Sequence, residues 1–280
     1  MNRKFFGKIR AEAIVINLLL LIISFTCIFP FIWLLYSSFK TNSEFLSDLF
    51  ALPTHLEWNN YYSALIRSHI LKYFINTVFN ALSSVAVIVF FTFCIGYYIA
   101  RYDFKGKKLA ESLLMLGMVV PVHALLVPMY MQFKIFNMVD HRGVLIFPYM
   151  GVMIPLTVFL IEAYVKAIPI DMEQSAGIEG ASLVNTILKI IIPMCKPIII
   201  TVIILAFNYS WNELPFSLIL NPSEKVRNMA VGIMNFSSQF NVNWAQRIAA
   251  CVIALLPVTF FYMLFNEQII QGMTEGAVKG

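Results

Sequence analysis

The stretch IPIDMEQSAGIEGASL, residues Ile168 to Leu183, separates two strongly apolar segments of the chain. It contains three of the fifteen acidic residues, together with one proline and two glycines. Proline suits the first turn of a helix, and acidic side chains suit its positively polarised N-terminal turn. Glycine readily adopts the left-handed conformation that ends a helix. The stretch therefore predicts a short acidic helix with an abrupt stop, placed in an otherwise hydrophobic protein.

The predicted helix is expected to begin at Pro169 and to weaken or end at Gly177 and Gly180. Ser182 can then cap a second helix, which ends near Pro193. Residues at three- and four-residue intervals give the first helix one small, partly apolar face, made of Met172, Ser175, Ala176 and Glu179. Such a helix fits a groove on another protein. The alternative is an interfacial helix that lies on lipid.

The composition of the whole chain indicates a membrane protein. Of its 280 residues, 60% are hydrophobic and 12% are charged, whereas soluble domains carry roughly a quarter charged residues. The net charge of +5 bears on orientation in a membrane, because no basic run is interleaved with aromatic residues as nucleic-acid binding requires. The scattered cysteines form no Cys-x-x-Cys pair, which disfavours a disulfide framework or a zinc site; they are Cys27, Cys94, Cys195 and Cys251.

Six segments are apolar and long enough to span a bilayer, since a spanning helix needs about 20 mainly apolar residues. They are Ile14–Tyr36, Tyr73–Ala100, Leu109–Phe133, Val144–Val165, Pro197–Leu220 and Ile248–Phe265. Prolines inside spans are tolerated where neighbouring helices satisfy the freed carbonyls, so they favour a packed bundle. The first segment exceeds the apolar core of a cleaved signal peptide, about 7–15 residues, and we expect it to be retained.

The distribution of basic residues predicts the orientation of these spans. With the N-terminus inside, the inner segments hold 12 of the 20 Lys and Arg residues and the outer segments hold 8. The loop RYDFKGKK alone contains four, and the first ten residues contain four more. Because cytoplasmic loops are enriched in Lys and Arg, both termini and the 168–183 stretch are expected in the cytoplasm.

This topology divides the chain into five parts. They are a cytoplasmic N-terminus (1–13), a first transmembrane helix (14–36), an external loop (37–72), a core transmembrane domain (73–270) and a cytoplasmic tail (271–280). The core contains a cytoplasmic loop, 166–196, around the opening stretch. In the external loop, EWNNYYSAL is expected to be an amphipathic element at the outer interface.

A longer part of the sequence carries a family resemblance. IPIDMEQSAGIEGASLVNTILKIIIPMCKPIIITVIILAFNYSWNELPF, residues 168–216, resembles the permease subunits of ATP-binding-cassette (ABC) importers of the carbohydrate type, which are related to the maltodextrin permeases. That family has a cytoplasmic Glu-Ala-Ala-x-x-Asp-Gly-Ala-Ser loop and a downstream Leu-Pro-x-x-x-Pro pattern. MVVPVHALLVPMY, SWNE and the terminal GMTEGAVKG are similar to further signatures of these permeases.

The loop of this family maps onto the opening stretch with departures. Its positions fall on Gln174, Ser175, Ala176, Glu179, Gly180, Ala181 and Ser182. Gln174 replaces the first Glu and so loses a charge, which the adjacent Glu173 is expected to supply. Ser175 replaces the first Ala, and Glu179 replaces the usual Asp. The resemblance implies that these residues, Glu173 included, couple the permease to an ATPase.

The resemblance further implies an all-α membrane protein with the six-transmembrane-helix fold of a type I ABC importer permease. Its expected partners are a second, homologous permease in a heterodimer, two ATP-binding-cassette ATPase subunits, an extracytoplasmic solute-binding protein and membrane lipid. ATP and magnesium would be used by the ATPases, with no cofactor or metal in this chain, which lacks the phosphate-binding G-x-x-x-x-G-K-[ST] motif. The implied function is ATP-driven passage of a sugar or oligosaccharide by alternating access, without enzymatic chemistry.

The run NYSWNELPF is the most polar part of any predicted span. We expect Glu213 to be the only acid well inside a span, where a central charge costs roughly 2.5–3.5 kcal/mol on insertion scales. The residues Asn208, Trp211, Asn212 and Glu213 either line a solute path, with Trp211 stacking on a sugar, or bond to neighbouring helices beside a kink at Pro215.

Two rival functions remain open at this point. An ion-coupled secondary transporter would show midplane carboxylates and inverted repeats. A membrane scaffold would account for the spans but not for the interrupted acidic helix. Catalysis is disfavoured because the four histidines are scattered and no His-Glu-x-x-His motif occurs.

Overall fold

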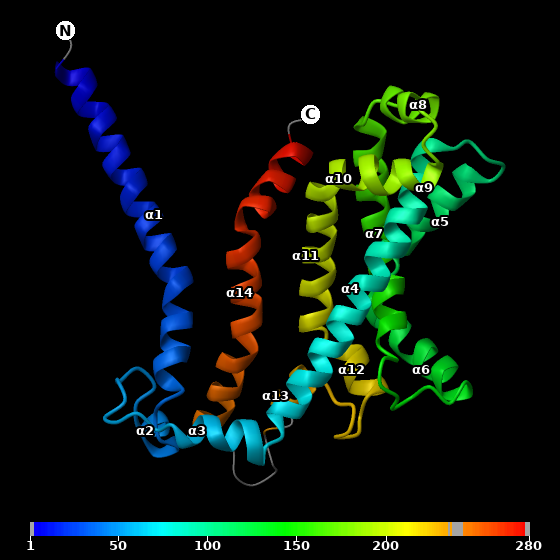
Figure 1. Cartoon of the computed structure of the whole chain (residues 1–280). Coiled ribbons are helices and arrows are strands. Elements are labelled where there is room, and N and C mark those ends of the chain that lie inside the picture. The colour runs from blue at the N-terminus through cyan, green and yellow to red at the C-terminus, as the bar shows by residue number, and fades with distance from the viewer. Residues whose placement is uncertain (1–2, 235, 237–242, 278–280) are drawn as a thin grey trace. The chain divides into compact units, whose positions relative to one another are not determined.

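The computed structural model describes residues 3–234, 236 and 243–277, with side chains for 13–234, 236 and 243–265. All regular secondary structure in these residues is helical (Figure 1). The chain divides into two compact units, Met1–Ile70 with Asn235–Leu256, and Leu71–Met234 with Pro257–Gly280. Most side chains of the two expected tails, 1–13 and 271–280, and the GMTEGAVKG motif lie outside the described side chains.

The first unit begins with a long apolar helix, α1 (Arg3–Ser37), which covers the expected first transmembrane segment. None of its most apolar 18-residue window within Ala13–Ser37 is buried in the chain. A helix that is hydrophobic on every side requires lipid or another protein around it. The helix α1 therefore contributes little to a core of its own chain.

The expected external loop is a folded element. It contains α2 (Asn42–Ser47), α3 (Asn59–Tyr62) and the π-helix η1 (Ser63–Arg67). Lys40 is buried, and its Nζ donates to the carbonyls of Asp48 (3.1 Å) and Leu49 (3.0 Å). The Asn60 amide donates to the carbonyls of Ser38 (2.9 Å) and Lys40 (2.8 Å). These bonds tie the end of α1 to α3.

A capping box orders the start of α2. The Thr41 hydroxyl accepts from the Glu44 N–H (3.2 Å), and the Glu44 carboxylate accepts from the Thr41 N–H (2.8 Å). The Thr54 hydroxyl also donates to Glu44. The bond from Thr54, followed by that from the Thr41 backbone, lowers the pKa of the Glu44 carboxyl to about 2.

The second unit contains the remaining helices. They are α4 (Ile70–Arg101), α5 (Lys107–Val119), the 3₁₀ helix η2 (Val122–Leu125), α6 (Leu126–Ile135), α7 (Ile146–Ala167), α8 (Asp171–Ile178), α9 (Leu183–Thr186), the π-helix η3 (Ile187–Ile191), α10 (Ile192–Met194), α11 (Lys196–Asn212), α12 (Pro215–Leu220), α13 (Met229–Met234) and the end of α14 (Trp244–Ala277). The helix α7 packs against α5 and α11, and α12 packs against α6.

Small residues allow close helix packing in this unit. A Cβ on Gly96 of α4 would lie 2.8 Å from Cγ2 of Ile161 on α7. Nearby, the hydroxyls of Thr92 and Thr157 hydrogen-bond across the same two helices at 2.8 Å. Close approach at small residues and interhelical hydroxyl bonds are both typical of helices packed within a membrane. The helices α4 and α7 are therefore in direct contact.

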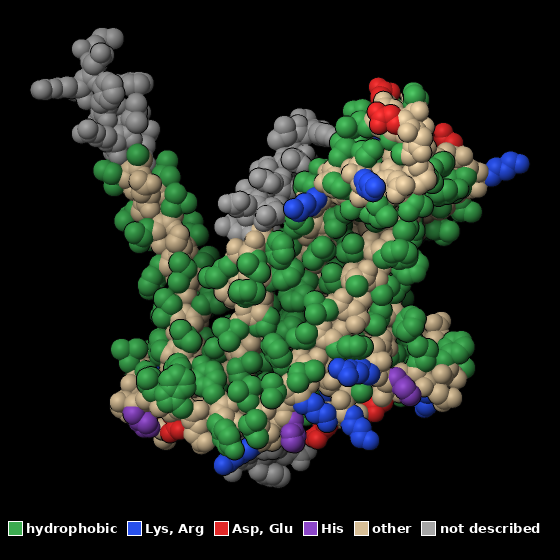
Figure 2. Space-filling model, in the orientation of Figure 1, with side chains coloured by type: hydrophobic (Ala, Val, Ile, Leu, Met, Phe, Trp, Pro, Cys, Tyr) green, Lys and Arg blue, Asp and Glu red, His purple; other side chains and the backbone are tan. Residues whose placement is uncertain are grey.

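The second unit has two chemically distinct ends. The end of α4, the start of α5, the end of α7 and all of α8 gather at one end, and α6, α12 and α13 lie at the other (Figure 1). On the face shown in Figure 2, hydrophobic side chains cover the middle of α4 and α11, while charged side chains gather near the two ends. This distribution suits helices whose middle parts lie in hydrocarbon.

In the described residues, the six predicted spans correspond to four single helices and two bent pairs of helices. Among the described residues, four helical segments are long and apolar enough to cross a membrane alone: Ala13–Ser37, Ile70–Arg101, Ile146–Ala167 and Trp244–Phe265. The other two candidate spans are bent pairs, Lys107–Val119 with Val122–Ile135 (96°) and Leu183–Met194 with Lys196–Asn212 (75°). The count rises to six when each bent pair is taken as one span.

Proline explains the break in the third predicted span. Val120, directly before Pro121, has an extended backbone (ψ 122°), as steric contact with a following proline favours. The 13 residues of α5 extend about 20 Å at 1.5 Å per residue, short of the roughly 30 Å of a hydrocarbon core. The third predicted span is therefore a bent pair of helices that is broken at Pro121.

Candidate functional site

The helix predicted in the opening stretch is α8, and it begins two residues later than expected. Pro169 lies in the turn before it, where its carbonyl accepts from the Met172 N–H (3.4 Å). The helix ends at Ile178, and Gly180 adopts a left-handed backbone with φ +83°. The Ala181 N–H closes the stop by donating to the Ala176 carbonyl (2.9 Å). The predicted glycine stop is confirmed at Gly180.

Gly177 was expected to weaken or to end the helix, and its position is compatible only with the first of these effects. It lies inside α8, and its φ is not positive. A Cβ added there would meet no atom within 4 Å. Gly177 therefore weakens the helix through its conformational freedom alone, and it does not end it.

The cap predicted at Ser182 is confirmed. Ser182 has an extended backbone (ψ 155°), and its hydroxyl accepts from the Asn185 N–H (3.3 Å). Helical structure then continues from Leu183 through η3 to Met194, one residue past the expected end. The chain bends by 75° there before α11 begins at Lys196.

The expected small face of α8 is divided between solvent and the protein interior. Met172, Ser175 and Glu179 are exposed, at least in part, whereas Ala176 is buried against its own chain. Ile178, which the sequence did not single out, is 88% exposed. Among the other motif positions, Gln174, Gly180 and Ser182 are exposed and Ala181 is half-buried.

Glu173 points toward α4 and away from solvent. Its Oε1 pairs with Nε of Arg101 at 2.6 Å, and its Oε2 accepts from the Tyr97 hydroxyl at 2.6 Å. Arg101 also donates from Nη2 to the Ile168 carbonyl (3.0 Å). The side chains of the pair are only 8% and 14% exposed. The expectation that Glu173 offers an outward charge in place of Gln174 does not fit this geometry, because both carboxylate oxygens are engaged internally.

The polar run at the end of α11 contains a second buried acid. Glu213 lies between α11 and α12, where its Oε1 accepts from the Phe216 N–H (2.6 Å) and its Oε2 from the Ser217 N–H (3.1 Å). The Tyr149 hydroxyl donates to the same Oε2 (3.2 Å). A carboxylate is favourable at a helix N-terminus. Glu213 is thus a buried cap at a break, and the fifth predicted span is not one continuous helix.

The four residues suggested for a solute path do not share one surface. Trp211 is buried between Phe74 (ring centroids 5.6 Å, edge to face) and Phe207 (5.5 Å, stacked). Asn208 and Asn212 are exposed, and the Asn212 amide donates to the backbone and side-chain oxygens of Asn208, each at 2.9 Å. For Trp211 and Glu213 the geometry favours bonding to neighbouring helices, beside the break at Pro215.

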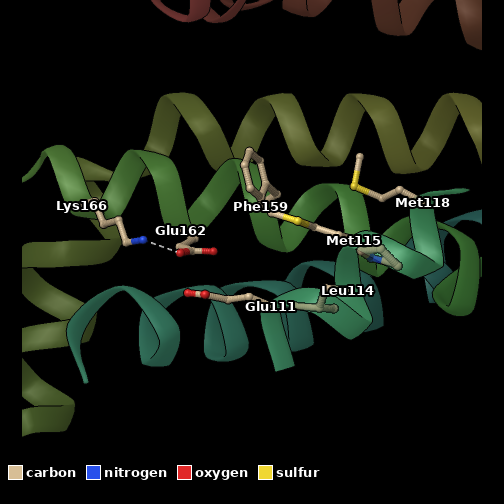
Figure 3. A pocket seen from close by; sticks show the side chains of 8 residues that line it. Glu111, Leu114, Met115, Met118, Phe159, Glu162 and Lys166 are labelled. Atoms are coloured by element: carbon tan, nitrogen blue, oxygen red, sulfur yellow. Dashed lines mark hydrogen bonds and ion pairs between the residues drawn. The ribbon is translucent and has the colours of Figure 1, made fainter. Parts of the chain in front are cut away.

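A buried acid on α7 was missed by the sequence reasoning. Glu162 lies within the fourth predicted span, so the expectation that Glu213 is the only such acid is wrong. Its Oε1 pairs with Nζ of Lys166 at 2.5 Å, an i,i+4 arrangement that is readable from sequence. Glu162 and Lys166 line a small cavity of about 180 Å³ together with Glu111 of α5. Figure 3 shows the side chains of these residues. In the described part of the chain, no cluster of three His, Cys, Asp or Glu residues suits a metal ion.

Comparison with known proteins identifies the family of the chain. Residues 92–275 match the model of the family described as "binding-protein-dependent transport system inner membrane component". The multiple sugar-binding transport system permease protein MsmG of Streptococcus mutans is 31% identical over 255 residues, which cover 89% of this chain and 91% of that protein. The arabinooligosaccharides transport system permease protein AraQ of Bacillus subtilis is 29% identical, over 95% of this chain and 96% of its own.

A solved structure shows the same fold. One chain of a bacterial ABC transporter involved in the import of the acidic polysaccharide alginate superposes with a TM-score of 0.80 and 19% identity, over 92% of this chain and 96% of that one. This likeness confirms the expected all-α fold of an ABC importer permease, and the family match confirms the resemblance seen in residues 168–216. The chain therefore belongs to the family of binding-protein-dependent transport system inner membrane components, as a multi-pass membrane permease subunit and not an enzyme.

Proposed function

We propose that this chain is the permease subunit of an ATP-driven importer for a sugar or an oligosaccharide delivered by an extracytoplasmic solute-binding protein. The observation that carries the proposal is α8, an eight-residue helix with an exposed outer surface and a left-handed stop at Gly180. The relatives named for multiple sugars and arabinooligosaccharides support a carbohydrate as the solute. A protein of this kind carries a solute across a membrane and leaves it chemically unchanged.

In this proposal α8 is the coupling helix, which docks in a cleft of a separate ATPase subunit. The exposure and hydrogen bonds of its expected residues support a division of roles among them. The exposed Gln174, Ser175 and Glu179 contact the ATPase, joined by Met172 and Ile178. Gly180, Ala181 and Ser182 form the stop and the next cap, and Glu173 and Ala176 hold the helix to its own chain.

The proposed assembly contains this chain, a second homologous permease and two ATPase subunits. ATP and magnesium are used by the ATPases, with no cofactor in this chain. Both termini and α8 lie on the cytoplasmic side, in agreement with the basic loop RYDFKGKK, which lies at the same end of the second unit as α8. The apolar surface of α1 is covered by lipid or by the second permease.

The position of α8 in the chain, between α7 and α11, supports a mechanism of alternating access. It lies between the last residue of α7, Ala167, and the first residue of α11, Lys196, so a displacement of α8 acts on two membrane helices that also pack together. The exposed amides of Asn208 and Asn212 are the members of the polar run that we assign to the solute path. Trp211 and Glu213 support this region from within.

The experiment is uptake by reconstituted vesicles. The permease pair, both ATPases and the binding protein are placed in proteoliposomes, with ATP and labelled maltooligosaccharides or arabinooligosaccharides supplied on opposite sides. Uptake is expected only with hydrolysable ATP and is expected to persist when ionophores collapse all ion gradients. Uptake that follows an ion gradient and ignores ATP would instead identify a secondary transporter. Absence of uptake for every carbohydrate, with uptake of another class of solute, would overturn the carbohydrate assignment.

A further inference from the structure

The attachment of α8 to α4 is built from more than one contact. Arg101, the last residue of α4, reaches two points on the other segment, the Ile168 carbonyl before α8 and the Glu173 carboxylate in its first turn. Tyr97, one turn earlier on α4, bonds to the second oxygen of that carboxylate. The three bonds use different donor atoms, so they fix the orientation of α8 as well as its distance from α4.

These contacts are shielded from water. Tyr97 is 5% exposed and stacks on Phe93 with ring centroids 6.1 Å apart. Ile168 is buried in the same hydrophobic cluster as Tyr97. Removing one member of a buried ion pair leaves an uncompensated charge, which makes separation of such a pair unfavourable. The contacts of Arg101 with Glu173 and Ile168, and of Tyr97 with Glu173, therefore form a fixed attachment, which we call the joint.

The helix α4 extends from this joint to the opposite end of the second unit. It has 32 residues and is about 48 Å long at 1.5 Å per residue. Near its beginning, the Asn76 amide donates to the carbonyls of Lys225 (3.1 Å) and Arg227 (3.0 Å). The Asn80 amide donates to the side chain of Asn228 at 2.8 Å. A rigid helix bonded at both ends is a physical route for coupling between them.

We propose that Arg101, Glu173 and Tyr97 are positioning residues that make α8 and α4 move as one body. This inference rests on the proposed function, because it assigns the route by which movement of the coupling helix reaches the far side of the permease. In this account Glu173 does not contact the ATPase. The exposed residues of α8 bind the ATPase, and the buried joint transmits the movement of α8 to α4.

The test separates docking from transmission in the complete reconstituted importer. Glu173→Gln removes the charge with little change in shape, and Arg101→Lys keeps the charge but loses the two-pronged guanidinium. Two quantities are measured in the same vesicles, the ATP hydrolysed and the solute taken up. Docking is measured independently by crosslinking a cysteine at the exposed Ser175 to the ATPase in a cysteine-free background. Glu179→Gln, on the exposed side of α8, is the matched control.

Both joint variants are expected to lower the solute transported per ATP about tenfold, while crosslinking of Ser175→Cys stays within twofold of the wild type. Glu179→Gln, which lies in the proposed docking surface, is expected to lower crosslinking and uptake together. Tyr97→Phe removes one hydrogen bond and preserves the ring, so it is expected to fold normally and to lower the ratio about two- to threefold.

Three results would overturn the joint. The first is an unchanged amount of solute transported per ATP in both Glu173→Gln and Arg101→Lys. The second is a loss of crosslinking in Glu173→Gln that matches its loss of uptake. The third applies if the charged variants fail to reach the membrane, and it is an unchanged amount of solute per ATP in Tyr97→Phe. Failure of the proposed function looks different, because then the wild-type importer itself shows no ATP-dependent uptake.

Discussion

Two glycines three residues apart in α8 and its stop provide a matched test of the local structure. A Cβ added to either glycine would meet no atom within 4 Å, so alanine introduces no clash at either site. Gly180 has φ +83°, whereas Gly177 is helical. A left-handed conformation costs an L-residue roughly 1–2 kcal/mol, and alanine in a helix is favoured over glycine by about 0.5–1 kcal/mol. Gly180→Ala should therefore destabilise the stop, and Gly177→Ala should stabilise the helix.

Hydrogen exchange of the Ala181 N–H reports on this stop, because that group donates to the Ala176 carbonyl at 2.9 Å. Gly180→Ala is expected to lower its protection about 5- to 30-fold, the factor that corresponds to about 1–2 kcal/mol. Gly177→Ala is expected to raise it about two- to fivefold, as about 0.5–1 kcal/mol implies. Equal shifts of the same sign in both variants would refute the assignment of the stop to the backbone of Gly180.

Three further predictions concern other parts of the chain. Glu213→Gln removes the charge that two N–H groups and a hydroxyl bind, and should lower the free energy of unfolding by roughly 1.5–3 kcal/mol in thermal melts, while the exposed Asn212→Ala should not. Gly232→Ala forces a Cβ into the ring of Tyr73 and should lower the free energy of unfolding by roughly 1–3 kcal/mol through overpacking, a loss that Tyr73→Ala partly relieves in the double variant. The pKa of Glu44 is depressed from 4.5 to about 2, so its contribution to order in residues 41–54 is present above pH 4.5 and is lost as pH falls toward 2. Glu44→Gln should therefore show at neutral pH the change in tryptophan fluorescence that the wild-type protein shows in acid.

The parts of the fold that sequence predicted well are governed by local rules. The stop at Gly180 and the cap at Ser182 depend on residues within five positions of each other, and both were found where expected. The long apolar helices were also predicted well, because their length and composition are enough to identify them as candidate membrane spans. The start of α8 moved from Pro169 to Asp171, a shift of the size common at helix ends.

The parts that sequence missed depend on contacts between distant residues. The pairing of Arg101 with Glu173 joins positions 72 residues apart, and the sequence offered Arg101 only as one basic residue in a cytoplasmic loop. Ala176 fits an outward small face by periodicity, yet packing of its own chain buries it. Proline alone did not distinguish α7, which continues through Pro155, from the third predicted span, which breaks at Pro121.

The central claim is that the exposed side of α8 touches an ATPase on the cytoplasmic side of the membrane. A photo-reactive amino acid at Ser175 tests it most directly, because this side chain is exposed and the substitution leaves the Arg101–Glu173 contact intact. The account predicts a crosslink to the ATPase subunit whose yield changes between ATP-bound and nucleotide-free states. Crosslinks that form only with lipid, or only from the extracytoplasmic side, would contradict it.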